Sequence, residues 1–311
     1  MRQSESSPGT PVIAVVGPTA SGKSELGLAL ALELGGEVVG ADASQFYRGM
    51  DIGTAKLSVP ERRGVPHHQI DVLDLAQEAS VATYQTSARA DLAATRGRGR
   101  VPVVVGGSGL YVRGLLDRLE IPPTDPVVRG RWESELERVG PGVLQEQLAS
   151  RDPEAARSIG ARNGRRLVRA LEVVELTGQP FSATLPTREF LEPTVLLGLR
   201  VDREVLAARI AHRAEGMWRD GLPEEVRELD RRGLRRGRTA SRAVGYAQAL
   251  RQLDGELTAA QAIEETAVAT RQLARRQVAW WRPDPRVVWL EHDAPDLLEQ
   301  ALTLVREVSP G

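Results

Sequence analysis

The chain has 311 residues, a formal net charge of −1 and 41% hydrophobic residues, so it can bury one large core or two modest ones. It contains no cysteine, which excludes disulfides and thiolate metal sites. No apolar run reaches the length of a membrane span, and a polyanion could be held only by local charge clusters. We therefore expect a cytoplasmic protein, with residues 1–11 as a flexible polar tail that lacks the apolar stretch of a signal peptide.

The first predicted strand, Val12–Val16, leads through a glycine-rich segment into a helix expected over residues 25–34. The segment fits the pattern G-x-x-x-x-G-K-[ST] of a phosphate-binding loop. Its residues are Gly17, Pro18, Thr19, Ala20, Ser21, Gly22, Lys23 and Ser24.

A strand, a glycine loop and a helix in this order place several backbone N–H groups and a helix N-terminus around one point. Lys23 would add a positive charge there, and the Ser24 hydroxyl would hold Mg²⁺. The alternative is a glycine-rich turn that binds nothing. The surrounding strand and helix favour the phosphate site.

Two further predicted strands end beside residues that can do chemistry. The second strand, residues 37–42, ends in Asp42, and the third, residues 102–105, runs into a glycine-rich turn that contains Ser108. Asp42 could accept a proton from a hydroxyl or an amine, or it could only cap a turn or order the water around magnesium. Ser108 could donate a hydrogen bond to a leaving oxygen, or it could cap the next helix.

The alternation of apolar strands and helices, one of them starting at Ser80, predicts a parallel sheet with helices on both faces. Ligands of such sheets lie beyond the carboxyl ends of the strands, so the phosphate loop, Asp42 and Ser108 should converge on one crevice. The third strand does not end in the acid that usually orients water in ATP hydrolysis, and no N-K-x-D motif occurs. We therefore expect phosphate binding without the usual hydrolysis machinery.

The second half of the chain reads as mostly helical. Prolines near residue 122 introduce a predicted helical insertion over residues 119–193, so the core domain combines residues 12–118 with 194–311. A strand near residues 194–199 returns to the sheet, and Asp202 should cap a helix that carries Arg209, Arg213 and Met217. A possible edge strand follows at residues 287–290. The predicted fold is α/β, a P-loop NTPase-like parallel sheet with a helical insertion and a mostly helical C-terminal third.

Two arginine-rich segments stand out in a chain of near-zero charge. Arg162, Arg165, Arg166 and Arg169 are expected on one helix face, and nine arginines lie between residues 235 and 282, near Trp280-Trp281. Arginines interleaved with exposed aromatics suit RNA phosphates and unstacked bases. Solvated helix faces with tryptophan in the core explain the pattern equally well.

Taken in order, these motifs resemble the tRNA dimethylallyltransferase (IPP transferase) family. The resemblance spans nearly the whole chain, and the strings at residues 51–56 and 270–277 are the most specific. The matching segments are residues 17–24, 41–45, 47–56, 65–68, 106–111, 166–172, 244–246 and 270–277.

The resemblance implies transfer of a dimethylallyl group from its diphosphate to N6 of the adenosine just 3′ of a tRNA anticodon. It implies that Asp42 accepts the N6 proton, Ser108 assists the leaving diphosphate, Arg213 grips it, and Mg²⁺ shares its charge. The expected partners are the tRNA anticodon stem-loop and dimethylallyl diphosphate, bound by a monomer. The implied tRNA contacts are Asp42, Ala43, Ser44, Gln45, Arg165, Arg166, Leu167, Val168, Arg169, Gly245, Tyr246, Arg271, Gln272, Arg275 and Arg276.

The chain departs from the family pattern in four places, which concern single RNA contacts and not the reaction. Ser108 stands where threonine is usual, Ala43 where serine is common, and Ala247 where a basic residue is usual. A proline is common where the insertion helix here begins with Asn163-Gly164.

Two other functions fit parts of the sequence. A small-molecule kinase would use the loop for ATP, whose polyphosphate tail the loop would accept, and Asp42 to activate a hydroxyl; it gives the C-terminal arginines no role. A nucleotide-gated RNA-binding module would use the arginines but not a carboxylate and a hydroxyl at neighbouring strand ends.

Overall fold

The computed structural model describes residues 10–184 and 188–308, so most of the predicted tail at residues 1–11 lies outside the described residues. Contacts within the chain divide it into two units. One unit combines Met1–Leu116 with Phe190–Gly311, and the other is Asp117–Glu189. The helical insertion predicted from sequence covers residues 119–193.

The first unit contains a sheet that has six strands in the described residues, in the order β3-β2-β4-β1-β5-β6, with every pair parallel. The expected edge strand is β6, beside β5. The order makes β2, β4 and β1 neighbours, so the segments that follow these three strands emerge side by side. The strands are β1 Val12–Val16, β2 Glu37–Gly40, β3 His67–His68, β4 Pro102–Gly106, β5 Thr194–Arg200 and β6 Val287–Glu291.

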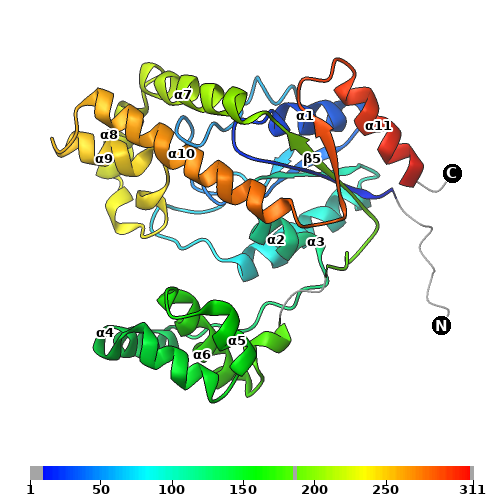
Figure 1. Ribbon diagram of the computed structural model, residues 1–311. Coiled ribbons are helices and arrows are strands. Elements are labelled where there is room, and N and C mark those ends of the chain that lie inside the picture. Colours follow the sequence, from blue (N-terminus) through cyan, green and yellow to red (C-terminus); the bar gives the residue numbers. More distant parts are fainter. Residues whose placement is uncertain (1–9, 185–187, 309–311) are drawn as a thin grey trace, which may run out of the picture. The chain divides into compact units, whose positions relative to one another are not determined.

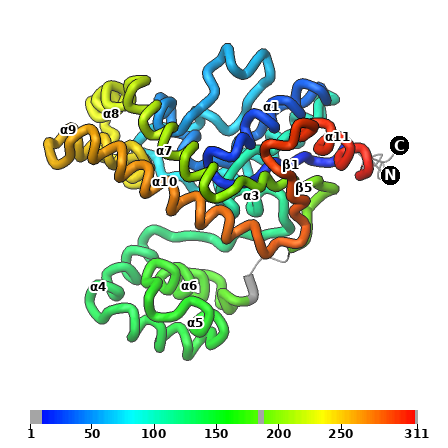
Figure 2. The backbone as a smooth tube through the Cα atoms, turned by 45° about the horizontal axis from the view of Figure 1, so that its top comes forward, coloured from blue at the N-terminus to red at the C-terminus, as the bar shows by residue number. Residues whose placement is uncertain are grey.

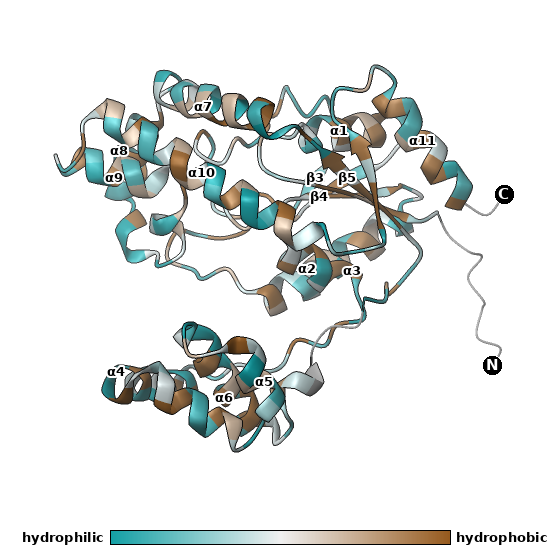
Figure 3. Cartoon of the chain, in the orientation of Figure 1, coloured by the Kyte–Doolittle hydropathy of each residue, from teal (hydrophilic) through white to brown (hydrophobic). Residues whose placement is uncertain are grey.

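Alternate residues of the buried strands pack into two separate cores, one on each face of the sheet. In β1, Ile13 and Val15 join the core formed with helices α1 (Lys23–Glu33) and α11 (Leu297–Val308). Ala14 and Val16 join the opposite core, which contains α2 (Val81–Gly97), α3 (Gly109–Leu116) and Trp281. Figure 1 shows α1 with α11 and α2 with α3 as the two layers, and Figure 3 shows the apolar strands between them. The predicted parallel α/β sheet with helices on both faces is confirmed.

Besides the helices that cover the sheet, the described part of the first unit contains helices α7 to α10. Helices α7 and α10 pack side by side (Figures 1 and 2), and α8 and α9 form a third core with Tyr47 and Met50. No described helix has the length and hydropathy needed to cross a lipid bilayer. The bounds are α7 Arg203–Arg219, α8 Leu222–Arg231, α9 Tyr246–Leu253 and α10 Ala259–Trp281, with short 3₁₀ helices at Leu234–Arg236 and Ala240–Arg242.

Two helix starts occur where side-chain capping predicts them. The Ser80 hydroxyl accepts a hydrogen bond from the Thr83 amide at the start of α2. The Asp202 carboxylate accepts from the Glu204 amide at 2.7 Å and from the Val205 amide at 3.2 Å at the start of α7. These caps satisfy amides that have no acceptor within the helix.

Two predicted boundaries are wrong. Helix α1 starts at Lys23 instead of residue 25, because Gly22 turns the chain directly into the helix. Strand β2 ends at Gly40, so Asp42 lies two residues beyond the strand.

The second unit is a small helical bundle with its own core around Trp132, Leu144 and Leu171. The predicted helix face containing Arg162 is wrong in one member. Asn163 accepts a hydrogen bond from the Arg166 amide and starts the helix after Arg162, which lies outside it. The bounds are α4 Pro126–Ala149, α5 Pro153–Ile159 and α6 Gly164–Thr177, with a 3₁₀ helix at Phe181–Thr184.

Candidate active site

The phosphate-binding loop connects β1 to α1, and its backbone depends on glycine. Gly22, the N-cap residue of α1, has φ of 92° and ψ of 5°, a left-handed conformation that glycine adopts without steric cost. Ala20 has φ of 65°, which is uncommon for a residue with a Cβ and tends to occur at binding sites. The loop therefore presents the unpaired amides and the positive dipole end of α1 to an anion.

A cavity of about 430 Å³ lies beside this loop. Its lining includes Lys23 and Ser24 from the loop, Asp42 from the segment after β2, and Arg213 from α7. All four are predicted site residues. The cavity thus joins the phosphate-binding loop, the candidate base and the arginine expected to grip a diphosphate.

The rest of the cavity lining contains basic and apolar residues, together with Glu25 and neutral polar side chains. Arg209 and His212 lie on the same helix as Arg213, at spacings of four and one residues, and are the basic residues. Neither residue is among the predicted site residues, although the spacing of four residues places Arg209 on the same helix face as Arg213. The apolar residues include Val38, Ala55, Leu57, Ile70 and Val105.

Burial and neighbouring charges shift the pKa values of two cations beside the cavity. Burial lowers the pKa of Lys23 to about 8, with Arg213 acting in the same direction and Asp42 opposing it. Burial also lowers the pKa of Arg213, against the opposing influence of Glu25 and Asp42. Two cations that lack full hydration and repel each other would be stabilised by an incoming anion. This electrostatic arrangement favours a diphosphate in the cavity.

Asp42 is held in a fixed orientation by its neighbour Ser44. The Ser44 amide and hydroxyl donate to Asp42 Oδ1, at 3.1 and 2.6 Å. Within the part of the chain that the structure describes, Asp42 Oδ2 accepts no hydrogen bond. Oδ2 is therefore the oxygen available to accept a proton in the cavity.

Ser108 occupies the turn between β4 and α3. Gly106, at the end of β4, lines the cavity, whereas Ser108 is not among the lining residues. Its carbonyl accepts the Val112 amide in the first turn of α3. Ser108 therefore directly precedes α3, and both its capping role and its contact with a leaving oxygen stay predictions.

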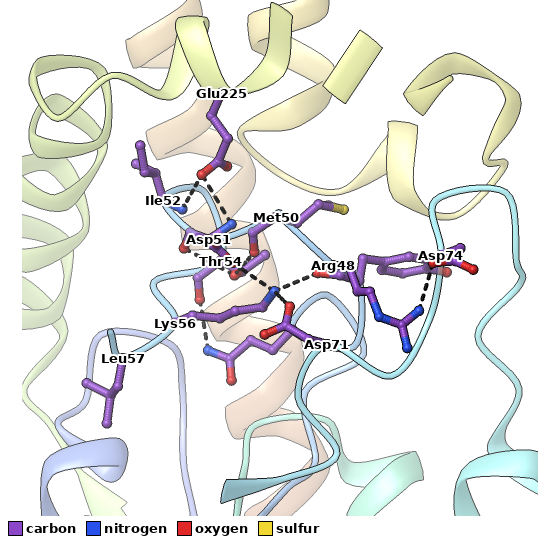
Figure 4. Close-up of polar contacts among 12 residues, drawn as sticks. Arg48, Met50, Asp51, Ile52, Thr54, Lys56, Leu57, Asp71, Asp74 and Glu225 are labelled. Carbon is purple, nitrogen blue, oxygen red and sulfur yellow. Dashed lines mark hydrogen bonds and ion pairs between the residues drawn. The ribbon is translucent and has the colours of Figure 1, made fainter. Parts of the chain in front are cut away.

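The segment after Asp42 forms another part of the cavity lining, and Figure 4 shows its polar contacts. Gln45 Nε2 donates to the carbonyl of Thr54 at 3.0 Å, and both residues line the cavity. Lys56, with 2% of its side chain exposed, donates to the carbonyl of Tyr47 and to Asp71 Oδ1, each at 2.6 Å. These bonds fold the segment back on itself and fix its cavity-lining residues.

Glu225 of α8 fastens the same segment from outside. Its Oε2 accepts the amides of Asp51 and Ile52, at 3.2 and 2.8 Å (Figure 4). Its Oε1 accepts the hydroxyl of Tyr246 at 2.5 Å. Tyr246 is fully buried against Gly53, where an added Cβ would lie 2.4 Å from the ring. The side chain of Tyr246 therefore supports the wall, so an RNA contact at this position would have to be indirect.

The predicted RNA-binding residues of α10 differ in their surroundings. Arg275, Arg276 and Gln272 are exposed, and neither arginine forms an ion pair with another described residue. Arg271 is half-buried and pairs with Glu264 at 3.0 Å. Arg275 and Arg276 are thus the cations of α10 best placed to meet a polyanion.

Further predicted RNA contacts in the first unit lie at turns. Gly245 precedes α9 with φ of 89°, a left-handed value that favours glycine. Ala43 is partly buried against the core around Phe46. Both act here through the backbone and through packing.

The predicted RNA face in the second unit also divides. Arg165 and Arg166 are exposed, whereas Leu167 and Val168 are buried in the bundle core. Arg169 donates to Glu172 Oε2 at 2.7 Å and to the carbonyls of Pro122 and Pro123.

Glu172 is a fully buried charge that organises the start of this bundle. Burial alone would raise its pKa, but hydrogen bonds from Arg169, Arg129 and Thr124 hold the pKa at about 2. Arg169 is therefore tied into the bundle, and Arg165 and Arg166 are the accessible cations of this helix.

The strand–loop–helix geometry, the basic cavity and the oriented carboxylate define a phosphate-binding α/β enzyme. The IPP transferase family model matches residues 45–284. A tRNA dimethylallyltransferase of Thermobifida fusca is 58% identical over 96% of this chain and 95% of its own, and one of a Nocardioides species is 54% identical over 97% and 98%. The chain therefore belongs to the IPP transferase family and has tRNA dimethylallyltransferase activity.

Solved structures agree. The tRNA isopentenylpyrophosphate transferase of Bacillus halodurans is 36% identical, with a TM-score of 0.69 over 96% of this chain and 98% of its own. A eukaryotic dimethylallyltransferase acting on tRNA is 26% identical, with a TM-score of 0.81 over 95% of this chain and 77% of its own. The family resemblance and the fold class expected from the sequence are confirmed.

Proposed function

We propose that the cavity beside the phosphate-binding loop is where the dimethylallyl group passes from its diphosphate to N6 of the adenosine 3′ to a tRNA anticodon. The observation that carries this proposal is the shared lining of one cavity by Lys23, Ser24, Asp42 and Arg213. In the reaction the N6 lone pair forms a bond to the allylic carbon. The carbon–oxygen bond breaks, and its electron pair leaves with the diphosphate.

The prenyl donor, which has a charged and an apolar part, fits the mixed lining of the cavity. The diphosphate would lie against the amides of residues 22–24, with Lys23 and Arg213 balancing its charge. The five-carbon group would lie against the apolar lining around Leu57, Ile70 and Val105. This assignment explains why one cavity combines cations with apolar side chains.

Magnesium fits the same site as an ion shared with the substrate. The described residues contain no cluster of three or more His, Cys, Asp or Glu side chains suited to hold a metal alone. The Ser24 hydroxyl, the predicted protein ligand of the ion, lines the cavity, and Mg²⁺ commonly combines few protein oxygens with substrate phosphates. When bound, the ion would neutralise part of the charge that develops on the diphosphate.

Asp42 would take the proton that N6 loses. Ser44 holds Oδ1, which leaves Oδ2 facing the reaction. An exocyclic amine is a weak nucleophile, so removing its proton as the new bond forms lowers the barrier. The adenine would have to leave its stack to reach the cavity.

The tRNA would be held by exposed cations on both units, Arg165 and Arg166 on α6 and Arg275 and Arg276 on α10. Their guanidinium groups suit RNA phosphates. We propose that the chain acts as a monomer. We further propose that the chain acts in the cytoplasm.

A transfer assay with two labelled donors tests the proposal. Unmodified tRNA is incubated with the chain, Mg²⁺ and either dimethylallyl diphosphate labelled in its carbon chain or ATP labelled in its terminal phosphate. The proposal predicts carbon label in the RNA at the adenosine 3′ to the anticodon. Label that stays out of RNA, or transfer of phosphate from ATP to a small molecule, would contradict it.

A further inference from the structure

Helix α10 contacts the phosphate-binding loop through Gln277, whose side chain is buried. The Thr19 amide donates to Gln277 Oε1 at 2.8 Å, across 258 residues of sequence. Only 9% of Gln277 is exposed. Because Thr19 N–H is a donor, the amide group of Gln277 must present its oxygen to the loop.

The same side chain lies against the turn that follows β4. A Cβ added to Gly107 would lie 2.2 Å from Gln277 Nε2 and 3.1 Å from the carbonyl oxygen of Gly17. The glycine at position 107 is therefore required by the close approach of α10 and of the phosphate loop. Gln277 occupies the point where both glycine turns meet.

A second residue of α10, one helical turn further, repeats the contact. A Cβ on Gly109 would lie 1.8 Å from the ring of Trp280. Gln277 and Trp280 thus press the same face of α10 onto residues 107–109, which include Ser108. The backbone of both turns is shaped by a helix from the far end of the chain.

The bond to Thr19 has a particular consequence for the loop. Thr19 precedes Gly22, Lys23 and Ser24, whose amides surround the phosphate position in a loop of this pattern. Its own amide points to α10 and not to the ligand. Fixing this one amide from outside restricts the rotation of the peptides that follow, which must all be oriented before an anion binds.

We propose that Gln277 is a positioning residue that pre-orients the phosphate-binding loop and the Ser108 turn for the leaving diphosphate. It rests on the proposed function only for the identity of the anion. Gln277 acts through Thr19 and Gly107, and it does not contact the reacting atoms. Its neighbours Arg275 and Arg276 are exposed on the same helix, so α10 carries the anchor and the accessible cations together.

The test compares Gln277→Met, which keeps the volume of the side chain but removes both amide atoms, with Gln277→Glu, which keeps an acceptor for Thr19. Val278→Ala, an exposed position next along the helix, is the matched control. Hydrogen exchange of the Thr19 amide is measured on the full chain. Gln277→Met should speed it about tenfold, whereas Gln277→Glu and the control should keep it protected.

Function is measured on the same variants as pyrophosphate affinity with Mg²⁺ and as steady-state prenyl transfer. Gln277→Met should weaken pyrophosphate binding and lower kcat by about tenfold, with the KM for tRNA within about twofold of the parent. Unchanged Thr19 exchange would overturn the proposal. So would a raised KM for tRNA at unchanged kcat, which would make Gln277 an RNA contact. If the parent chain transferred no prenyl group, the proposed function would fail, while Thr19 exchange would still decide the role of Gln277.

Discussion

The positive charge of Lys23 disfavours folding and favours the binding of an anion. It is a cation beside Arg213 in a partly dehydrated cavity, and its pKa of about 8 shows that the folded chain disfavours its charge. A bound diphosphate would reverse this penalty. Binding sites commonly hold such charges at the expense of stability.

This conflict predicts a pH-dependent stability. Between a folded pKa of about 8 and the ordinary value of 10.5, the unfolded chain binds more protons than the folded chain, so stability from this group rises with pH across that window. Lys23→Met should therefore raise the melting temperature by a few degrees near neutral pH, and the gain should shrink towards about pH 10. Thermal melts at several pH values measure this.

Saturating pyrophosphate with Mg²⁺ provides the control, because it should stabilise the parent chain more than the Lys23→Met variant. A variant that is less stable than the parent without ligand at neutral pH would show that Lys23 is not strained by burial.

At the scale of helices and strands, the sequence predicts the features that depend only on residues close together in the chain. The phosphate-binding loop follows from its glycine and lysine spacing, and the starts of α2 and α7 follow from Ser80 and Asp202. The alternating apolar runs predict the parallel sheet. In each case the signal and the structure lie within a few residues of each other.

The contacts that build the site's walls could not be found in this way. The partner of Thr19 is 258 residues away, and Glu225 binds the Asp51 amide across 174 residues. Arg169 is predicted to bind RNA, but its guanidinium donates to the carbonyls of Pro122 and Pro123, 47 and 46 residues away. Such pairs depend on the packing of whole elements, which no local spacing encodes.

Tyr246 offers a test of wall building against RNA contact. Its hydroxyl donates to Glu225, which holds the amides of Asp51 and Ile52. Tyr246→Phe should lower the free energy of unfolding by about 1–2 kcal/mol, because the partly buried carboxylate of Glu225 loses a partner. Denaturant unfolding measures the loss, and RNA affinity should stay within about twofold. A large drop in RNA affinity at unchanged stability would assign Tyr246 to the RNA interface.

The exposed arginines of helix α10 lead us to expect that the affinity for tRNA depends on salt concentration. If Arg275 meets an RNA phosphate, Arg275→Ala should weaken tRNA binding and reduce the slope of log affinity against log salt by about one. Binding titrations at several salt concentrations give the slope. Arg306→Ala is the control, since Arg306 is also exposed but pairs with Glu299 on α11. An unchanged slope for Arg275→Ala would mean that this arginine is only solvated.

Over the whole molecule, the net charge of −1 does not describe the local surroundings of the charged side chains. Many exposed arginines are neutralised by nearby acids, such as Arg235 by Asp230 and Asp254. The cavity collects Lys23, Arg209 and Arg213 from two elements, the start of α1 and helix α7. Electrostatic attraction for a diphosphate is therefore a property of the fold and not of the composition.

The central claim is that this one cavity both holds the diphosphate and removes the proton from N6. Single-turnover prenyl transfer, with tRNA and dimethylallyl diphosphate bound in advance to Asp42→Asn, tests it most directly. Asparagine keeps an oxygen for the Ser44 hydrogen bonds but is a far weaker base, so the transfer rate should fall at least about a hundredfold while both substrates bind as before. A rate within about tenfold of the parent chain would contradict the role of Asp42 and, with it, the single-cavity account.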